Sequence, residues 1–194
     1  MWDQRYQSSE YAYGESPNDY LKSQIKRFKK DAHILLPADG EGRNGVFLAR
    51  QGFKVTTFDQ SAVGCKKAEL LAKKFDVDLS IHHDSLNTFS FSAYDGIILC
   101  FFHLPPNDRV RLHHICQQAL NPNGILVLNG FDVSQLPLSS GGPKDPAMLF
   151  TTDIIQNDFQ QLSILELSHY SYMLNEGPFH QGAAELVGFV GQKQ

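Results

Sequence analysis

A glycine-rich turn between a short apolar run and a helical pattern constrains this chain more than any other feature. The run His33–Pro37 predicts a buried strand, and the turn Asp39-Gly40-Glu41-Gly42-Arg43-Asn44-Gly45 follows it with the spacing Gly-x-Gly-x-x-Gly. Arg43–Gln51 has the pattern of a helix, with Gly52 just past its end. Glycines permit a tight turn, and the free N–H groups at a helix start favour negative charge. The order of strand, glycines and helix therefore indicates a ligand site at this turn.

An acid follows the next predicted strand at the spacing that nucleotide-binding units use. Lys54–Phe58 is rich in β-branched residues and predicts a strand that ends at Asp59, 19 residues after Gly40. A carboxylate at that place can accept hydrogen bonds from both hydroxyls of a ribose. The alternative, an ordinary strand–helix turn with a surface aspartate, is less favoured because it leaves the combined pattern unexplained.

Strand and helix patterns continue to alternate along the chain. Helices are predicted at Ala62–Phe75, Asp108–Leu120 and Asp153–Phe159, the first two capped by Ser61 and Asn107, and further strands at Asp78–His83, Tyr94–Phe102 and Ile125–Asn129. Five strands separated by helices predict a parallel sheet. Two alternating segments, Leu162–Tyr170 and Ala184–Lys193, predict an antiparallel pair at its edge, joined by a turn over 175–182. The Gly-, Ser- and Pro-rich stretch Gln135–Ala147 predicts an exposed loop.

Composition narrows the class of protein. A chain of 194 residues with 42% hydrophobic residues fits one domain, in which 1–30 is an N-terminal lid or cap and 31–194 is the core. Seventeen basic and 21 acidic residues give a net charge of −4, which argues against a nucleic-acid partner. The longest apolar run, 97–102, is too short for a membrane helix, and the N-terminus has no signal-peptide pattern. We expect a cytoplasmic monomer or homodimer with a small-molecule partner.

The cysteines and paired histidines predict no metal site. Cys65, Cys100 and Cys116 are odd in number and match no zinc spacing, so we expect reduced, buried thiols. His82-His83 and His113-His114 are adjacent pairs, which do not share a face and are expected at the surface.

Two cofactors use this geometry, a nicotinamide dinucleotide and S-adenosylmethionine. About 110 residues follow the third strand, too few for a second mononucleotide half with a substrate domain. Glu41 would face a pyrophosphate with like charge. The chain also lacks a Tyr-x-x-x-Lys pair for a short oxidoreductase. S-adenosylmethionine is therefore favoured, a non-catalytic module that binds it stays open, and an NAD(P) oxidoreductase is less favoured.

Several motifs carry a resemblance to a known family over nearly the whole chain. They are Trp2-Asp3-x-Arg5-Tyr6, Tyr11-x-Tyr13-Gly14-x-x-Pro17-Asn18, Gly40-Glu41-Gly42-Arg43-Asn44, Val55-Thr56-x-x-Asp59-x-Ser61, His103-Leu104-Pro105, Gly141-Gly142-Pro143-Lys144 and Glu176-Gly177-x-x-His180-x-Gly182. The chain resembles class I S-adenosylmethionine-dependent methyltransferases, of the small bacterial branch akin to tellurite-resistance and thiopurine methyltransferases.

The resemblance implies an α/β fold: a three-layer, Rossmann-like, seven-stranded, mostly parallel sheet with a C-terminal antiparallel hairpin. It assigns to the cofactor Tyr13, Ala38, Asp39, Gly40, Glu41, Gly42, Arg43, Asp59, Gln60, Ser61, Asp84, Ser85, Leu86, Phe101 and Phe102. The loop would line the methionine and ribose, Gln60 and Ser61 would border the adenine, and residues 84–86 would address its amino group. Leu36 stands where relatives carry an acid, so the ammonium would meet Asp39 or backbone carbonyls. Asn129 stands where relatives often have Glu.

Candidates for the acceptor side are His103 and His180. A hydroxyl or amine acceptor needs a base with a pKa near neutrality, whereas a thiolate or chalcogen oxyanion needs little help. For both histidines a structural role is about as well supported as a catalytic one. Arg5, Arg43 and Arg109 would bind an anionic acceptor, or else form salt bridges. Trp2, Tyr6, Tyr11 and Tyr13 predict either a lid over the site or a docked cap.

Overall fold

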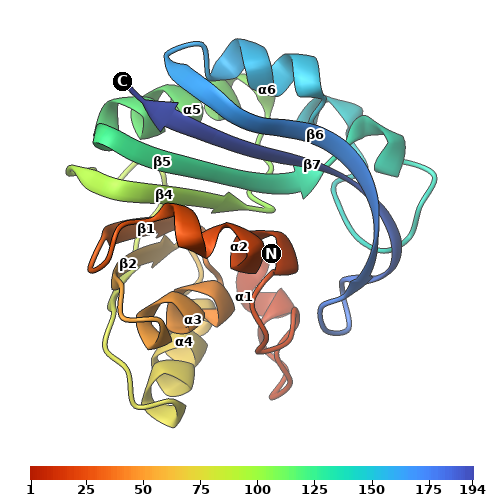
Figure 1. Cartoon of the computed structure of the whole chain (residues 1–194). Coiled ribbons are helices and arrows are strands. Elements are labelled where there is room, and N and C mark those ends of the chain that lie inside the picture. Colours follow the sequence, from red (N-terminus) through yellow and green to blue (C-terminus); the bar gives the residue numbers. More distant parts are fainter.

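The computed structural model describes residues 1–194 as a seven-stranded sheet flanked by helices (Figure 1). The strands are β1 (His33–Pro37), β2 (Lys54–Asp59), β3 (Ser80–His83), β4 (Tyr94–Cys100), β5 (Leu120–Phe131), β6 (Leu162–Asn175) and β7 (Gln181–Lys193). Their order is β3-β2-β1-β4-β5-β7-β6. The first five strands pair in parallel, and β7 runs antiparallel to both β5 and β6. The predicted fold class is confirmed.

Helices cover both faces of the sheet. They are α1 (Trp2–Arg5), α2 (Asp19–Gln24), α3 (Arg43–Arg50), α4 (Ala62–Lys74), α5 (Pro106–Ala119) and α6 (Thr152–Asp158). Successive side chains of β1 enter different clusters: Ile34 and Leu36 pack with Leu21 of α2 and Leu48 of α3, whereas Leu35 packs with residues of α5 and α6. This alternation follows from the two-residue period of a strand, and it makes the fold three layers thick. No helix is both long enough and apolar enough to cross a membrane.

Some element boundaries differ from those predicted. Helix α5 begins at Pro106, and Asn107 lies inside it rather than before it, because proline at a first helical position is already in helical geometry. Helix α5 ends at Ala119, next to the predicted stop at 121–124, and those four residues fall within the bounds of β5, whose pairing with β4 passes from Leu120 to Ile125. Strand β6 continues to Asn175 and β7 begins at Gln181, so both are longer at the turn than predicted, and β3 is shorter than predicted. Ser61 caps α4 as predicted, since its hydroxyl accepts from the Gly64 N–H (3.0 Å).

The loop after β5 is more closely held than its composition suggests. Gln135 and Ser140 are buried, and they bond to each other through Gln135 Nε2 and Ser140 Oγ (2.9 Å). The Ser140 hydroxyl donates to the Ala183 carbonyl of β7 (2.7 Å). The predicted exposed loop is therefore anchored at its centre to the hairpin.

Candidate functional site

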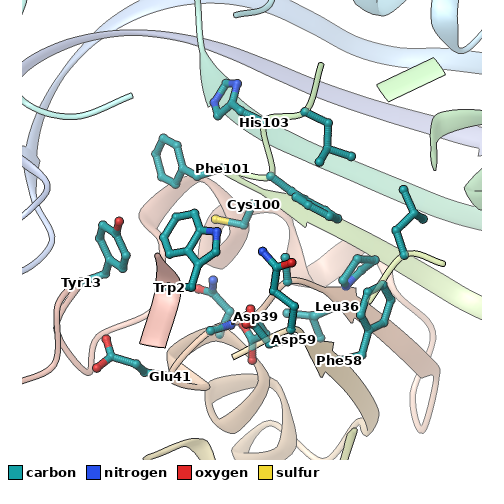
Figure 2. Close-up of a pocket in the computed structure, with 18 of the residues that line it drawn as sticks. Trp2, Tyr13, Leu36, Asp39, Glu41, Phe58, Asp59, Cys100, Phe101 and His103 are labelled. Carbon is teal, nitrogen blue, oxygen red and sulfur yellow. Dashed lines mark hydrogen bonds between the residues drawn. The ribbon is translucent and has the colours of Figure 1, made fainter. Parts of the chain in front are cut away.

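A cavity of about 590 Å³ opens at the carboxyl ends of β1, β2 and β4, where ligands of open parallel sheets bind. Its wall includes thirteen of the residues assigned to the cofactor: Tyr13, Ala38, Asp39, Gly40, Glu41, Arg43, Asp59, Gln60, Asp84, Ser85, Leu86, Phe101 and Phe102. Figure 2 shows Phe58 and Asp59 on one side of it and Phe101 and His103 across from them. Gly42 and Ser61, also assigned to the cofactor, are not part of the wall. The Ser61 hydroxyl bonds to Gly64 and Asp3 instead.

Asp59 and Gly40 form the part of the cavity that fits a ribose. The Gly40 N–H donates to Asp59 Oδ2 (2.9 Å), and the Ser61 N–H donates to Oδ1 (2.8 Å). These bonds fix the buried carboxylate while leaving each oxygen further acceptor capacity for a sugar hydroxyl. Burial raises the pKa of the Asp59 carboxyl. Gly40 has φ +58°, and a Cβ there would lie 2.6 Å from the Tyr6 hydroxyl.

The segment after β3 forms the neighbouring part of the wall. The Asp84 N–H donates to the Asp59 carbonyl (3.0 Å), so β3 delivers 84–86 beside the end of β2. Leu86 and Phe102 are half-buried and pack on the larger core cluster, which gives this end apolar surface. The polar side chains of Gln60, Asp84 and Ser85 complete it. Apolar faces with a few polar groups are what an adenine ring requires.

The acidic and basic residues of the glycine loop bind the N-terminal segment. The Ala12 N–H donates to Glu41 Oε2 (2.7 Å), and Glu41 also forms an ion pair with Lys67 of α4. Arg43 donates to the Tyr13 carbonyl (3.2 Å). The Asn18 N–H donates to Asn44 Oδ1 (2.9 Å). These contacts show a docked cap over the cavity and give Glu41 and Arg43 a role that the sequence did not predict.

Gly42 supports helix packing rather than the ligand's approach. Its φ is +86°, and a Cβ would lie 2.6 Å from the Cβ and 2.8 Å from the Cα of Ala68 in α4. The third glycine, Gly45, has a Cβ position 2.6 Å from Asp39 Oδ2 and 2.9 Å from Thr57. Both glycines therefore let α3 pack closely against its neighbours.

Asp39 binds the start of α3. Its Oδ2 accepts from the Gly45 N–H (3.0 Å), and its Oδ1 is buried without a partner in the protein. Burial raises the pKa of this carboxyl to about 7. Since Leu36 is apolar, Asp39 Oδ1 is the buried acceptor at this end of the cavity that a ligand ammonium would satisfy.

His103 has no free ring nitrogen. Its Nδ1 lies 2.8 Å from the Met148 carbonyl, and its Nε2 accepts from the Phe131 N–H (3.0 Å). The hydrogen is therefore on Nδ1, and burial lowers the pKa of the ring to about 4. This geometry contradicts a role as catalytic base: His103 joins the β4–α5 loop to β5 and to the loop before α6.

His180 has the opposite arrangement. The ring is buried in the turn between β6 and β7, and its Nδ1 lies 3.3 Å from Glu176 Oε2. Its Nε2 has no hydrogen-bond partner in the protein, and the residue lines the cavity. The rings of Tyr13 and Phe101 lie 4.5 Å from it, centroid to centroid. Burial lowers the pKa of His180, so the ring is neutral near pH 7.

The three candidate arginines have different partners and different positions relative to the cavity. Arg109 pairs with Asp158 (2.8 Å) between α5 and α6, away from the cavity, so the salt-bridge alternative holds for this residue. His113, predicted at the surface, is buried and pairs with the same carboxylate (2.7 Å). Arg43 pairs with Glu176 (2.8 Å). Arg5 alone lines the cavity without a carboxylate partner, over the Phe179 ring.

Two of the residues assigned to the cofactor have a strained backbone, which no sequence signal predicted. Ala38 and Phe101 have φ of +55° and +53°, a region that residues with a side chain seldom adopt. Both line the cavity, Ala38 before the glycine loop and Phe101 directly after β4. Such strain is concentrated at functional sites because the surrounding structure must hold it.

Comparison with known proteins agrees with this geometry. The family model described as "Methyltransferase domain" matches residues 34–124, from β1 into β5. Residues 34–124 therefore match a methyltransferase domain, and the whole chain has the fold of class I methyltransferases. No curated protein matches it in sequence.

Solved structures of methyltransferases superpose on nearly all of this chain. TehB from Haemophilus influenzae is 14% identical with a TM-score of 0.74, over 100% of this chain and 66% of that one. N-methyltransferase NodS from Bradyrhizobium japonicum WM9, in complex with S-adenosyl-L-homocysteine, is 11% identical with a TM-score of 0.75, over 99% and 96%. Magnesium protoporphyrin IX methyltransferase ChlM from Synechocystis PCC 6803, with bound SAM, is 16% identical with a TM-score of 0.66, over 91% and 76%.

The residues that line this cavity fit S-adenosylmethionine. Asp59 is held for a ribose, and residues 84–86 form a wall for an adenine. Asp39 Oδ1 is a buried acceptor without a partner. A cavity of about 590 Å³ lies within the range of small-molecule sites and has room beside a cofactor.

Proposed function

We propose that this chain is an S-adenosylmethionine-dependent methyltransferase and that it acts on a small-molecule acceptor that is neutral or anionic, such as a thiol or a chalcogen oxyanion. The observation that carries the proposal is the chemistry around His180. The nearby carboxylate, Glu176, is already paired with Arg43, so no free acid remains there for a cationic amine. Arg5 adds positive charge at the cavity wall.

When bound, S-adenosylmethionine would supply a methyl group activated by a sulfonium; the acceptor's lone pair would bond to that carbon, and the electrons of the broken carbon–sulfur bond would stay on sulfur. The protein's task is then mainly alignment and exclusion of water. The aromatic rings of Tyr13 and Phe101, together with the docked N-terminal segment, enclose the acceptor end. An acceptor that carries a proton passes it to His180 Nε2.

Binding and turnover test the proposal separately. Isothermal titration with S-adenosylmethionine, S-adenosylhomocysteine and NAD should give heat with the first two only. Formation of S-adenosylhomocysteine should then depend on an acceptor from a panel of thiols, selenite and tellurite, with primary amines as the matched negative set. Cofactor binding without turnover on any member would favour a non-catalytic binding module. Turnover on amines alone would refute the acceptor class.

A further inference from the structure

Glu176 is bound from three sides by parts of the chain that are far apart in sequence. Its Oε2 accepts from Arg43 Nη2 (2.8 Å) and faces His180 Nδ1 (3.3 Å). Its Oε1 accepts from Asn18 Nδ2 (2.9 Å). All four side chains are buried. One carboxylate therefore connects the N-terminal cap, the cofactor loop and the β6–β7 turn.

These partners keep Glu176 ionised. Burial by itself would raise the pKa of the carboxyl, but the hydrogen bond from His180 and the charge of Arg43 outweigh it and hold the pKa at about 2. An ionised carboxylate only accepts hydrogen bonds. Since Glu176 cannot donate, the hydrogen between the two side chains must be on His180 Nδ1.

We propose that Glu176 is a positioning residue that fixes His180 in the Nδ1–H tautomer and so presents the Nε2 lone pair to the acceptor. The inference rests on the proposed function and assigns a residue that acts through His180 rather than on the substrate. When an acceptor X–H is methylated, its proton moves to Nε2 and the resulting imidazolium is stabilised by the carboxylate at Nδ1. The proton then leaves to solvent, so the protein ends the cycle unchanged.

The surrounding amides hold the carboxylate in place. Asn18 Nδ2 donates both to Glu176 and to Asn129 Oδ1 (3.2 Å), while Asn129 Nδ2 donates to the Tyr170 hydroxyl (2.8 Å) and the Val187 carbonyl (3.1 Å). The Asn129 side chain thus accepts a hydrogen bond from Asn18 through its oxygen and donates through its nitrogen to Tyr170 and Val187. A glutamate there could not donate to the Val187 carbonyl, which explains why an amide suits this position.

Four other groups face the His180 ring. Arg43 from α3 and Arg5 from α1 both lower its pKa, whereas Glu176 raises it. His103, across the cavity wall, is neutral, and Tyr13 contributes its ring face. In Glu176→Gln only the two arginines remain as charged groups near the ring, so the pKa of His180 should fall. Because the base works only when it is unprotonated, the acidic limb of the pH–rate profile should move to lower pH.

A tautomer measurement tests the proposal without any variant of Glu176. Histidine labelled with ¹⁵N is read by long-range ¹H–¹⁵N correlation in the cofactor-free protein, and His180→Gln identifies the ring by the loss of its signals. We expect a protonated Nδ1 and an unprotonated Nε2 at pH 7.5. An Nε2–H tautomer or an imidazolium at that pH would overturn the proposal.

Kinetics with two thiols supply the second readout. One is an aromatic thiol that is ionised at the assay pH, and the other is an alkyl thiol that keeps its proton. Glu176→Gln and His180→Gln should each lower kcat about 10–100-fold for the alkyl thiol, with much smaller effects on KM and on the ionised thiol. Glu185→Gln is the matched control, because Glu185 also pairs with a histidine (His169, 2.7 Å) on the same hairpin but away from the cavity. Equal losses for both thiols would contradict the positioning role.

Titration with S-adenosylhomocysteine distinguishes a failure of the proposed function from a failure of the positioning role of Glu176. If wild type does not bind it, the proposed function fails, whereas the tautomer result is independent of cofactor. If Glu176→Gln binds it as wild type does and keeps the wild-type kcat and pH profile on both thiols, the proposed function stands and the positioning role is refuted.

Discussion

His103 gives the structure a measurable pH dependence. Its two ring nitrogens bond to the Met148 carbonyl and the Phe131 N–H, and the buried ring has a pKa of about 4 against an ordinary value of 6.5. The unfolded chain therefore takes up a proton near pH 6.5, whereas the folded chain does not until about pH 4. Stability from this residue is complete above pH 6.5 and is lost as the pH falls toward 4.

The expected magnitude follows from the difference between the two pKa values. At about 1.4 kcal/mol per pKa unit, the shift corresponds to roughly 3 kcal/mol in total, of which about 2 kcal/mol is lost between pH 7.5 and pH 5. Urea unfolding at a series of pH values measures this loss as a change in the free energy of unfolding.

The variant His103→Gln isolates this contribution. Glutamine can also accept one hydrogen bond and donate another, but it does not titrate. Other histidines, such as His113 and His180, contribute equally to both proteins and cancel in the difference. We expect the gap in stability between wild type and His103→Gln to shrink by about 2 kcal/mol between pH 7.5 and pH 5. A gap that stays constant with pH would refute the assignment of both ring nitrogens to the backbone.

Three further predictions concern the loop and the cap. Asp59→Ala should weaken S-adenosylhomocysteine binding by about 1.5–3 kcal/mol in isothermal titration, because it removes a charged acceptor; unchanged affinity would contradict the ribose assignment. Gly42→Ala should lower the free energy of unfolding, measured in urea, by about 1–3 kcal/mol more than Gly52→Ala does. Both glycines have φ near +86°, but only at Gly42 would a Cβ lie within 3 Å of the α4 backbone. Equal losses would show that backbone strain alone matters. Glu41→Gln removes the ion pair with Lys67, so limited proteolysis should cut residues 1–15 faster than in wild type, and an unchanged cutting rate would show that the cap is held by other contacts.

The order of elements and the place of the site could be predicted because both depend on local patterns. The alternation of β-branched runs with helical patterns determines which segments pair, and a glycine turn after β1 lies at the carboxyl edge of any parallel sheet. Boundaries were less certain. The segment 121–124 has turn composition, and it lies inside β5 as an irregularity between Leu120, which pairs with Tyr94, and Ile125, which pairs with Gly96.

The charged residues of the loop show what local patterns leave undecided. Glu41 and Arg43 stand in the loop assigned to the cofactor, but their partners are Ala12, Lys67 and Glu176, up to 133 residues away. No pattern within a strand or helix specifies such a distant partner.

Sequence alone determined that this chain forms a mostly parallel sheet with a glycine turn and a carboxylate at its ligand-binding edge. Strands and helices have characteristic sequence periods, and the glycine turn and the carboxylate follow directly after predicted strands. Each of these features can therefore be recognised in a short stretch of sequence. Only the tertiary structure decided between His103 and His180. Two backbone groups occupy both nitrogens of the first, and a single carboxylate occupies one nitrogen of the second. What a histidine can do depends on which of its nitrogens is free, and distant segments of the folded chain decide that.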